Sequence, residues 1–271
     1  MAEAEAGTTG AAGKVNWLPE GFHSVTPYLV APNAAETIEF MKTVFGATEA
    51  MRFSLPETNR IMHAELRIGD SMLEIGDDNK DVPPRPAAMH VYVPDVDAAC
   101  KRALAAGATS IHNVMDMEYG ERGGGVKDRA GNHWYIATAV GANHIPEGLR
   151  SVNLYLHSVS APAMIEFMKN AFAAEEVIVV KTPEGVVAHA KIRVGDSVIE
   201  MSEAHGQYQP LPCGIHYYVP DCDAVYQRAL RAGAKAEEEP QDQPYGDRIA
   251  SVKDPNGNLW FIATHIRDVV L

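Results

Sequence analysis

Residues 63–71 read HAELRIGDS, and residues 189–197 read HAKIRVGDS. Three further segments of the chain also occur twice, in the same order and 126 or 127 positions apart. They are IEFMK at 38–42 and 165–169, HVYVPDVDA at 90–98 and HYYVPDCDA at 216–224, and KDRAGNHWYIAT at 127–138 and KDPNGNLWFIAT at 253–264. A repeat of this length is a whole domain rather than a solenoid unit, so the chain is a tandem duplication.

The repeat sets the predicted domain boundaries. We expect a flexible N-terminal arm at residues 1–19, a first domain at 20–140, a linker at 141–148 and a second domain at 149–271. The arm is rich in Ala, Gly, Thr and Glu, and it lacks the basic and apolar regions of a secretory signal.

Each copy contains two successive units of the same kind. In the first unit, Asn33 and Glu36 form a capping pair at the start of a helix that ends at Gly46. Strands are predicted at 48–55, 60–68 and 71–77. The pattern restarts with a strand at HVYVP, a helix opened by Pro94-Asp95, and strands near 108–115, 122–128 and 132–138. The fold class is therefore α+β, with four β-α-β-β-β units in all.

The charged residues of the chain exclude some classes of binding partner. The chain carries 23 Lys and Arg against 36 Asp and Glu, a formal net charge of −13. This charge repels phosphate backbones and anionic membrane surfaces, so neither nucleic acid nor membrane is an expected partner. Three scattered cysteines form no CxxC pair, and no apolar run is long enough to span a bilayer. A cytoplasmic protein is expected.

The segments TPYLVAPNAAETIEFMKTVFG, MHAELRIGDSMLEI, HVYVPDVDAACKRALAAGA and YGERGGGVKDRAGNHWYIAT resemble the vicinal oxygen chelate superfamily, and most of all its PhnB-like branch. That superfamily includes glyoxalase I, bleomycin-resistance proteins and extradiol dioxygenases. The resemblance implies paired β-α-β-β-β units whose sheets curl into cups, with the helices outside and a small molecule or a metal inside. It also implies a divalent metal that chelates two substrate oxygens.

The family's usual metal ligands are only half present in each copy. The resemblance places these ligands on the first and last strand of each unit, as His or Gln, Glu, His and Glu. The matching positions here are Thr26, Glu74, His90 and Tyr135 in the first copy, and Asn153, Glu200, His216 and Phe261 in the second. We therefore expect no resident cofactor, with a divalent metal as the alternative.

A two-histidine, one-carboxylate set is that alternative. Strand alternation places His63 and Glu65 on the same face as Glu74, so each copy has three candidate donors. The predicted sets are His63, Glu74 and His90 in the first copy and His189, Glu200 and His216 in the second. Two other interpretations stay open: the histidines line a pocket without binding metal, or Arg67 and Arg193 neutralise Glu74 and Glu200.

Further candidate residues lie near the predicted cup mouths. Arg122 and Arg248, beside Tyr119 and Tyr245, suit an anionic ligand, but they also suit a loop-fixing ion pair. Aromatic residues replace polar ones at four predicted cup positions, which suits stacking of a planar molecule or filling of the cup. These residues are Tyr92, Tyr135, Tyr218 and Phe261. Trp134 and Trp260 fall on the opposite strand face and are predicted core residues.

Three functions stay open at this point. The first is a small-molecule binding protein of the glyoxalase and bleomycin-resistance kind, taking a planar or anionic ligand in one or both cups without the full metal set. The second is a metal-dependent lyase, isomerase or dioxygenase using a His-Glu-His site. The third is a protein-interaction scaffold whose cups are filled by their own side chains. The sequence does not decide whether the protein is an enzyme, and it allows a monomer or a homodimer.

Overall fold

A computed structural model describes residues 15–141 and 143–269, and it shows the order β-α-β-β-β four times. The first unit contains β1 (Val25–Ala31), α1 (Ala34–Phe45), β2 (Thr48–Ser54), β3 (Ile61–Ile68) and β4 (Ser71–Asp77). The second contains β5 (Ala88–Tyr92), α2 (Val96–Ala105), β6 (Thr109–Met117), β7 (Glu121–Lys127) and β8 (His133–Ala139). The third contains β9 (Val152–Ser158), α3 (Ala161–Phe172), β10 (Glu175–Lys181), β11 (Val187–Val194) and β12 (Ser197–Glu203). The fourth contains β13 (Gly214–Tyr218), α4 (Cys222–Arg231), β14 (Lys235–Asp242), β15 (Asp247–Lys253) and β16 (Leu259–His265).

The predicted α+β class with four units is confirmed, and the local signals act as expected. The side chain of Asn33 accepts a hydrogen bond from the backbone N–H of Glu36 and so caps α1. Gly46 ends that helix in the left-handed conformation, at a φ of 68°. No helix in the described parts of the chain is both long and apolar enough to cross a membrane.

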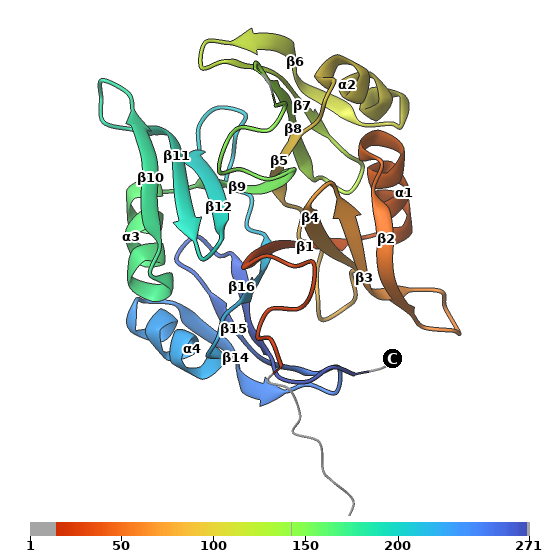
Figure 1. Cartoon of the computed structure of the whole chain (residues 1–271), viewed down its shortest axis with the longest axis vertical. Coiled ribbons are helices and arrows are strands. Elements are labelled where there is room, and N and C mark those ends of the chain that lie inside the picture. The colour runs from red at the N-terminus through yellow and green to blue at the C-terminus, as the bar shows by residue number, and fades with distance from the viewer. Residues whose placement is uncertain (1–14, 142, 270–271) are drawn as a thin grey trace, which may run out of the picture.

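The strands form two eight-stranded sheets, and each sheet takes one unit from each copy (Figure 1). The first sheet has the order β14-β15-β16-β13-β1-β4-β3-β2, so it joins unit 1 to unit 4 through the antiparallel pair β1 and β13. The second has the order β10-β11-β12-β9-β5-β8-β7-β6 and joins unit 2 to unit 3. Neither sheet is therefore built from one sequence copy alone, because each combines a unit of the first copy with a unit of the second.

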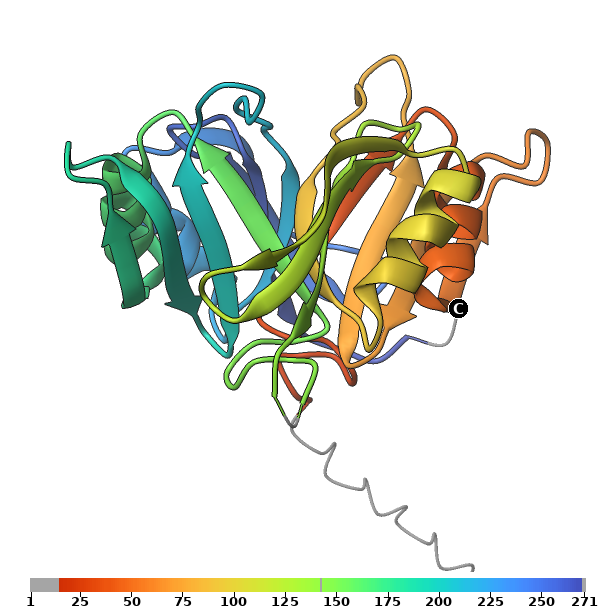
Figure 2. The ribbon, with the colours of Figure 1, turned by 90° about the horizontal axis from the view of Figure 1, so that it is seen from above.

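The helices pack by copy instead. Figures 1 and 2 show α1 beside α2 on one side of the molecule and α3 beside α4 on the other. Phe40 and Phe45 of α1 contact Trp134 of β8, with ring centroids 6.0 and 5.0 Å apart. Trp134 and Trp260 are both fully buried, which confirms their prediction as core residues. Each copy thus shares a helix-side core, while the opposite faces of the sheets remain free of helices.

The segments KDRAGN at 127–132 and KDPNGN at 253–258, just before the last strand of each copy, bind these tryptophans through hydrogen bonds. Asp128 accepts hydrogen bonds from the backbone and side-chain amides of Asn132 and from Nε1–H of Trp134, all at 2.9 Å. Asp254 does the same for Asn258 and Trp260. Because a buried carboxylate is tolerated only when it is hydrogen-bonded, this signature fixes a hairpin rather than a reaction centre.

The repeated Gly-Asp-Ser turns join the two sheets. Asp70 Oδ1 accepts from the backbone N–H of Ser151 at 2.8 Å, and Asp196 Oδ1 accepts from that of Ser24 at 2.7 Å. Gly69, at a φ of 58°, leaves space that the hydroxyl of Ser151 occupies. Each turn therefore holds the first strand of the opposite sheet, which explains why the motif occurs twice.

The repeat also extends further towards the N-terminus than predicted. Residues 16–21 read NWLPEG and residues 143–148 read NHIPEG. The carbonyl of Trp17 accepts from the N–H of His265 at 3.0 Å, and that of His144 accepts from the N–H of Ala139 at 3.1 Å. Trp17 also packs near Phe22, so residues 16–19 belong to the fold rather than to a flexible arm. Residues 1–14 of that predicted arm and Ala142 of the predicted linker lie outside the described residues.

Candidate functional site

Two candidate sites occupy the helix-free faces of the two sheets. We call the face of the first sheet cup A and that of the second sheet cup B. Strand register sets their lining because residues paired across neighbouring strands point to the same side. Cup A is lined by Tyr28, His63, Glu65, Glu74, His216, Tyr218 and Phe261, and cup B by Tyr155, His189, Lys191, Glu200, His90, Tyr92 and Tyr135.

A buried imidazole–carboxylate pair lies at the floor of cup A. His216 Nδ1 is 2.8 and 2.9 Å from the two carboxylate oxygens of Glu74. A carboxylate only accepts hydrogen bonds, so Nδ1 carries the proton and donates it. Nε2 of the same ring is buried and has no hydrogen-bond partner among the described residues. His216 is 6% exposed and Glu74 is 2% exposed, so both groups are held in a dry environment.

His63 lies above this pair, nearer to solvent. Its Nε2 is 3.6 Å from Glu65 and 4.0 Å from Glu74, and its Nδ1 is 3.5 Å from the hydroxyl of Tyr28. Burial lowers the pKa of His63, but Glu65 and Glu74 outweigh burial and leave that pKa raised above its usual value. The two glutamates thus favour the protonated form of His63, which would balance part of the negative charge in cup A.

Cup B contains the matching pair with an added carboxylate. His90 Nδ1 donates to Glu200 Oε1 at 2.9 Å, and His90 Nε2 lies 3.5 Å from Glu121 Oε2. The other oxygen of Glu121 accepts from the Tyr92 hydroxyl at 2.7 Å. Burial lowers the pKa of His90, yet Glu200 and Glu121 raise it further, so the pKa is above its usual value. The ring of His90 therefore lies between two glutamates, which favour its protonated form.

His189 takes the place of His63 in cup B but has the opposite electrostatic setting. Its Nε2 lies 3.4 Å from Glu200. Burial lowers its pKa, and the nearby positive charges of Lys191 and His90 lower it further, so the net shift is downward despite Glu200. We therefore expect His189 to be neutral at pH 7.

An aromatic cluster fills one end of cup B. The Tyr135 hydroxyl is 2.7 Å from His157 Nε2, and Tyr208 stacks on the His157 ring at a centroid distance of 5.5 Å. Burial, followed by the neighbouring His133 and His205, lowers the pKa of His157 to about 4. The lowered pKa keeps His157 neutral near pH 7, so this end of the cup is aromatic and carries no charge from His157.

The structure corrects the membership of the two predicted His-Glu-His sets. Glu74 of the first copy pairs with His216 of the second, and Glu200 pairs with His90. The predicted sets assumed that each copy builds its own cup, whereas β1 pairs with β13 and β5 with β9. The alternative in which Arg67 and Arg193 neutralise the glutamates is also wrong, because in the described structure histidines take that position.

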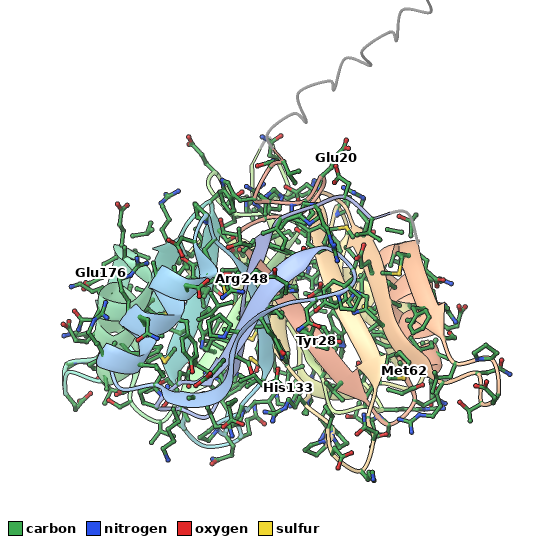
Figure 3. The ribbon with its side chains drawn as sticks, turned by 90° about the horizontal axis from the view of Figure 1, so that it is seen from below. Glu20, Tyr28, Met62, His133, Glu176 and Arg248 are labelled. Atoms are coloured by element: carbon green, nitrogen blue, oxygen red, sulfur yellow. The ribbon has the colours of Figure 1, made fainter. Side chains whose placement is uncertain are left out.

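Arg122 and Arg248 lie away from the cups. Arg122 donates to Asp97 of α2 at 2.7 and 2.8 Å and to Asp116 at 2.9 Å. Arg248 binds Asp223 of α4 and Asp242 in the same way, and Figure 3 shows it beside that helix. Strand alternation sends the preceding acids, Glu121 and Asp247, into the cups and these arginines to the helix face. The expected position at a cup mouth is therefore wrong for both arginines.

Of the remaining predicted site residues, some are exposed to solvent and others are buried. Tyr119 and Tyr245 are 72% and 46% exposed and lie at the rims. Tyr92 and Tyr218 are buried. Tyr218 stacks on the imidazole of His216 at a centroid distance of 4.4 Å, and Tyr92 contacts that of His90 at 4.5 Å in a tilted arrangement. The ring of Phe261 contacts that of Tyr28, with centroids 5.3 Å apart, and both rings lie on the face of cup A.

A divalent metal, which the family resemblance implies, does not fit the donors that are present. Each cup has a glutamate and a histidine at the expected positions, but these two bind each other rather than facing a common point. Across residues 15–141 and 143–269, no three His, Cys, Asp or Glu side chains are arranged to hold one metal ion. We therefore derive no chemistry through a metal.

A cavity of about 270 Å³ lies outside both cups, between α1 and the loop at 128–130. Its polar groups are already engaged: Arg129 donates to Glu36 at 2.6 Å, and Asp128 holds the hairpin described above. The cups are better candidates because their polar groups include unpartnered atoms.

Several cup residues were missed from the sequence. Tyr28 and Tyr155 lie two positions after Thr26 and Asn153, so period-two alternation could have indicated them. Glu121 and Asp247 directly precede Arg122 and Arg248, and because alternation sends neighbouring residues to opposite faces, it could have indicated these two acids as cup residues. Lys191 replaces Glu65 within the otherwise matching repeat, and comparing the two copies position by position would have shown it.

Known proteins resemble this chain in both sequence and fold. Residues 21–136 and 157–262 match the family model of the Glyoxalase/Bleomycin resistance protein/Dioxygenase superfamily. An uncharacterized protein of Mycobacterium bovis is 35% identical over 128 residues, which cover 43% of this chain and 84% of that protein. A relative in Mycobacterium tuberculosis is also 35% identical over 128 residues, covering 75% of its own length. The crystal structure of glyoxalase I from Zea mays aligns with 89% of this chain and 92% of its own, with a TM-score of 0.65 and 15% identity, which shows a shared fold.

Proposed function

Because the chain belongs to the Glyoxalase/Bleomycin resistance protein/Dioxygenase superfamily, we propose that it binds a small organic molecule in its cups through an imidazole held by a buried glutamate. The observation that carries this proposal is the pair of His216 and Glu74, which leaves Nε2 buried and without a partner in the described structure. A buried polar atom without a partner costs free energy, and a ligand hydrogen bond would remove that cost.

The lining around this atom supports binding. Tyr28 and Phe261 supply aromatic surface, and His63, whose side chain is 26% exposed, links the cup to solvent. Apolar walls with a few converging polar groups are typical of small-molecule sites. When the ring carries only the Nδ1 proton that it donates to Glu74, Nε2 of His216 is an acceptor for a ligand O–H or N–H group. The scaffold alternative is less favoured because it gives this acceptor no role.

Thermal unfolding with a library of small metabolites tests the proposal. We expect at least one organic compound to raise the Tm of the wild-type protein, and we expect Glu74→Gln to reduce that shift because it no longer orients His216. Glu57→Gln is the matched control, since Glu57 is exposed in the loop between β2 and β3. A compound that stabilises Glu74→Gln as much as the wild type would contradict the role of this pair.

Elemental analysis of protein purified without added metal or chelator tests the metal-dependent alternative. We expect no stoichiometric metal that depends on the imidazoles. Near-stoichiometric zinc, iron, manganese or nickel that disappears in His90→Ala/His216→Ala would refute the proposal and favour a metal-dependent enzyme.

A further inference from the structure

The two cups differ in charge at one pair of matching positions. Glu65 of β3 lies directly across from Glu74 of β4, whereas Lys191 of β11 lies directly across from Glu200 of β12. Like charges opposite each other destabilise a strand pair, and opposite charges stabilise it. In cup A the two glutamates repel each other, whereas in cup B the lysine at the position of Glu65 attracts Glu200.

A second pair of matching positions gives the same difference. In cup B, the longer Glu121 side chain brings its Oε2 to 3.5 Å from His90 Nε2, close enough for charge attraction although this oxygen forms no hydrogen bond among the described residues. In cup A, the matching Asp247 is one methylene shorter, and its oxygens are taken by the Tyr218 hydroxyl at 3.0 Å and by His265 Nδ1 at 2.7 Å. Nothing in the described structure then reaches His216 Nε2.

The charged side chains around the imidazoles differ between the two cups. Around its imidazoles cup A holds three carboxylates, Glu65, Glu74 and Asp247. The exposed Arg67 lies one pair further along the same strand face, across from Met72, and Arg193 matches it in cup B, so the arginines do not distinguish the two cups. Cup B holds two carboxylates, Glu121 and Glu200, together with Lys191. The pKa of His63 is raised and that of His189 is lowered, in agreement with the carboxylate of Glu65 in cup A and the ammonium of Lys191 in cup B. Although His265 pairs with Asp247, the exchange of Lys191 for Glu65 leaves cup A more negative than cup B.

We propose that cup A takes an organic cation with N–H donors, such as an ammonium or amidinium group, while cup B is closed to charged ligands by its own ion pairs. The cationic N–H groups would donate to His216 Nε2 and to Glu65. The rings of Tyr28 and Phe261, 5.3 Å apart, would stack on the cation. This inference rests on the proposed binding function and names the ligand class and the cup.

Two ligands of nearly the same shape and opposite charge test the inference: benzamidinium and benzoate. Each is titrated into the full chain while the ring signals of His63, His216, His90 and His189 are followed by NMR. We expect benzamidinium to shift the cup A signals and leave those of cup B unchanged, and benzoate to shift neither set. Signals in cup B that move as much as those in cup A, or a preference of cup A for benzoate, would overturn the inference.

Charge exchange at the selecting position is the second part of the test. Glu65→Lys gives cup A the arrangement that β11 and β12 already tolerate, so we expect a folded protein that binds benzamidinium at least about tenfold more weakly. Glu57→Lys makes the same charge change on an exposed loop and should alter binding less than about twofold, because solvent and salt screen it. An equal loss in both variants would mean that net charge, not cup A, attracts the cation.

A ligand-free readout separates this inference from the proposed function. In Glu65→Lys the pKa of His63 should fall, and in Lys191→Glu the pKa of His189 should rise. If these pKa values move as expected but no cation binds, the charge asymmetry holds and the ligand class is wrong. If neutral compounds from the metabolite library bind while benzamidinium does not, the proposed function stands and this inference fails.

Discussion

Replacing Glu200 with Gln should change both the stability of the fold and the titration of His90. Glu200 is 1% exposed, and Oε1 accepts from His90 Nδ1 at 2.9 Å. Glutamine keeps the shape and one acceptor but removes the charge opposite the imidazolium. A buried hydrogen bond to a charged group contributes about 1.5–3 kcal/mol, so we expect a loss of about 2 kcal/mol. For a chain of this size, that loss corresponds to a fall in Tm of roughly 4–8 °C.

The loss should depend on pH in a way that the two pKa shifts determine. The pKa of His90 is raised, so the stability it contributes is complete below its unfolded value of about 6.5 and is lost as pH rises through the folded pKa. The pKa of Glu200 is lowered, with His90 outweighing the effect of burial. Its contribution is therefore present above about pH 4.3 and is lost as pH falls through the folded pKa. The gap between wild type and variant should be widest between about pH 4.3 and 6.5.

Chemical unfolding at a series of pH values measures this gap, and NMR titration follows His90 directly. We expect the pKa of His90 to fall in Glu200→Gln, because burial then faces only one nearby glutamate, Glu121. Glu175→Gln, at an exposed position of β10, is the control and should leave both quantities unchanged. An unchanged His90 pKa in Glu200→Gln, or a gap that widens above pH 8, would refute the reasoning.

Three further predictions concern residues that hold the cups in place. Gly69→Ala should lower the free energy of unfolding by more than about 1 kcal/mol, since the left-handed φ and the Ser151 hydroxyl both oppose a Cβ; an unchanged urea midpoint would argue against this packing. Asp128→Ala should cost about 2–4 kcal/mol in urea unfolding because it leaves Nε1–H of Trp134 and the backbone and side-chain N–H groups of Asn132 without acceptors, whereas Asp81→Ala, at an exposed site, should cost under 0.5 kcal/mol. His157 should titrate near pH 4 by NMR, so the stability it provides is present above about pH 6.5 and falls as the solution is acidified towards 4; a normal titration would show that the Tyr135 and Tyr208 cluster is open to solvent.

Much of this fold could be predicted from the sequence because its signals are local. The capping pair Asn33 and Glu36, the turn at Gly69-Asp70-Ser71 and the alternation that buries Trp134 each act within a few residues. These features fix the type and the order of the elements, and the structure confirms them.

The pairing of units could not be predicted in the same way. The duplicated halves are so similar that β1 could meet the strand HVYVP of its own copy or HYYVP of the other, and local pattern does not distinguish the two. The choice depends on long-range packing, including α1 against α2 and the Asp70 and Asp196 turns. As a result, the predicted sets joined Glu74 to His90 and Glu200 to His216, whereas the structure pairs Glu74 with His216 and Glu200 with His90.

A double-mutant cycle on the free energy of unfolding tests the central claim most directly, namely that each cup joins residues from both copies. Glu74→Gln is combined with His216→Ala in one cycle and with His90→Ala in the other. We predict a coupling of about 1–3 kcal/mol for Glu74 with His216, which contact each other, and less than about 0.5 kcal/mol for Glu74 with His90, with which Glu74 forms no ion pair in the described structure. Strong coupling of Glu74 to His90 and none to His216 would show that each copy builds its own cup and would contradict the site described above.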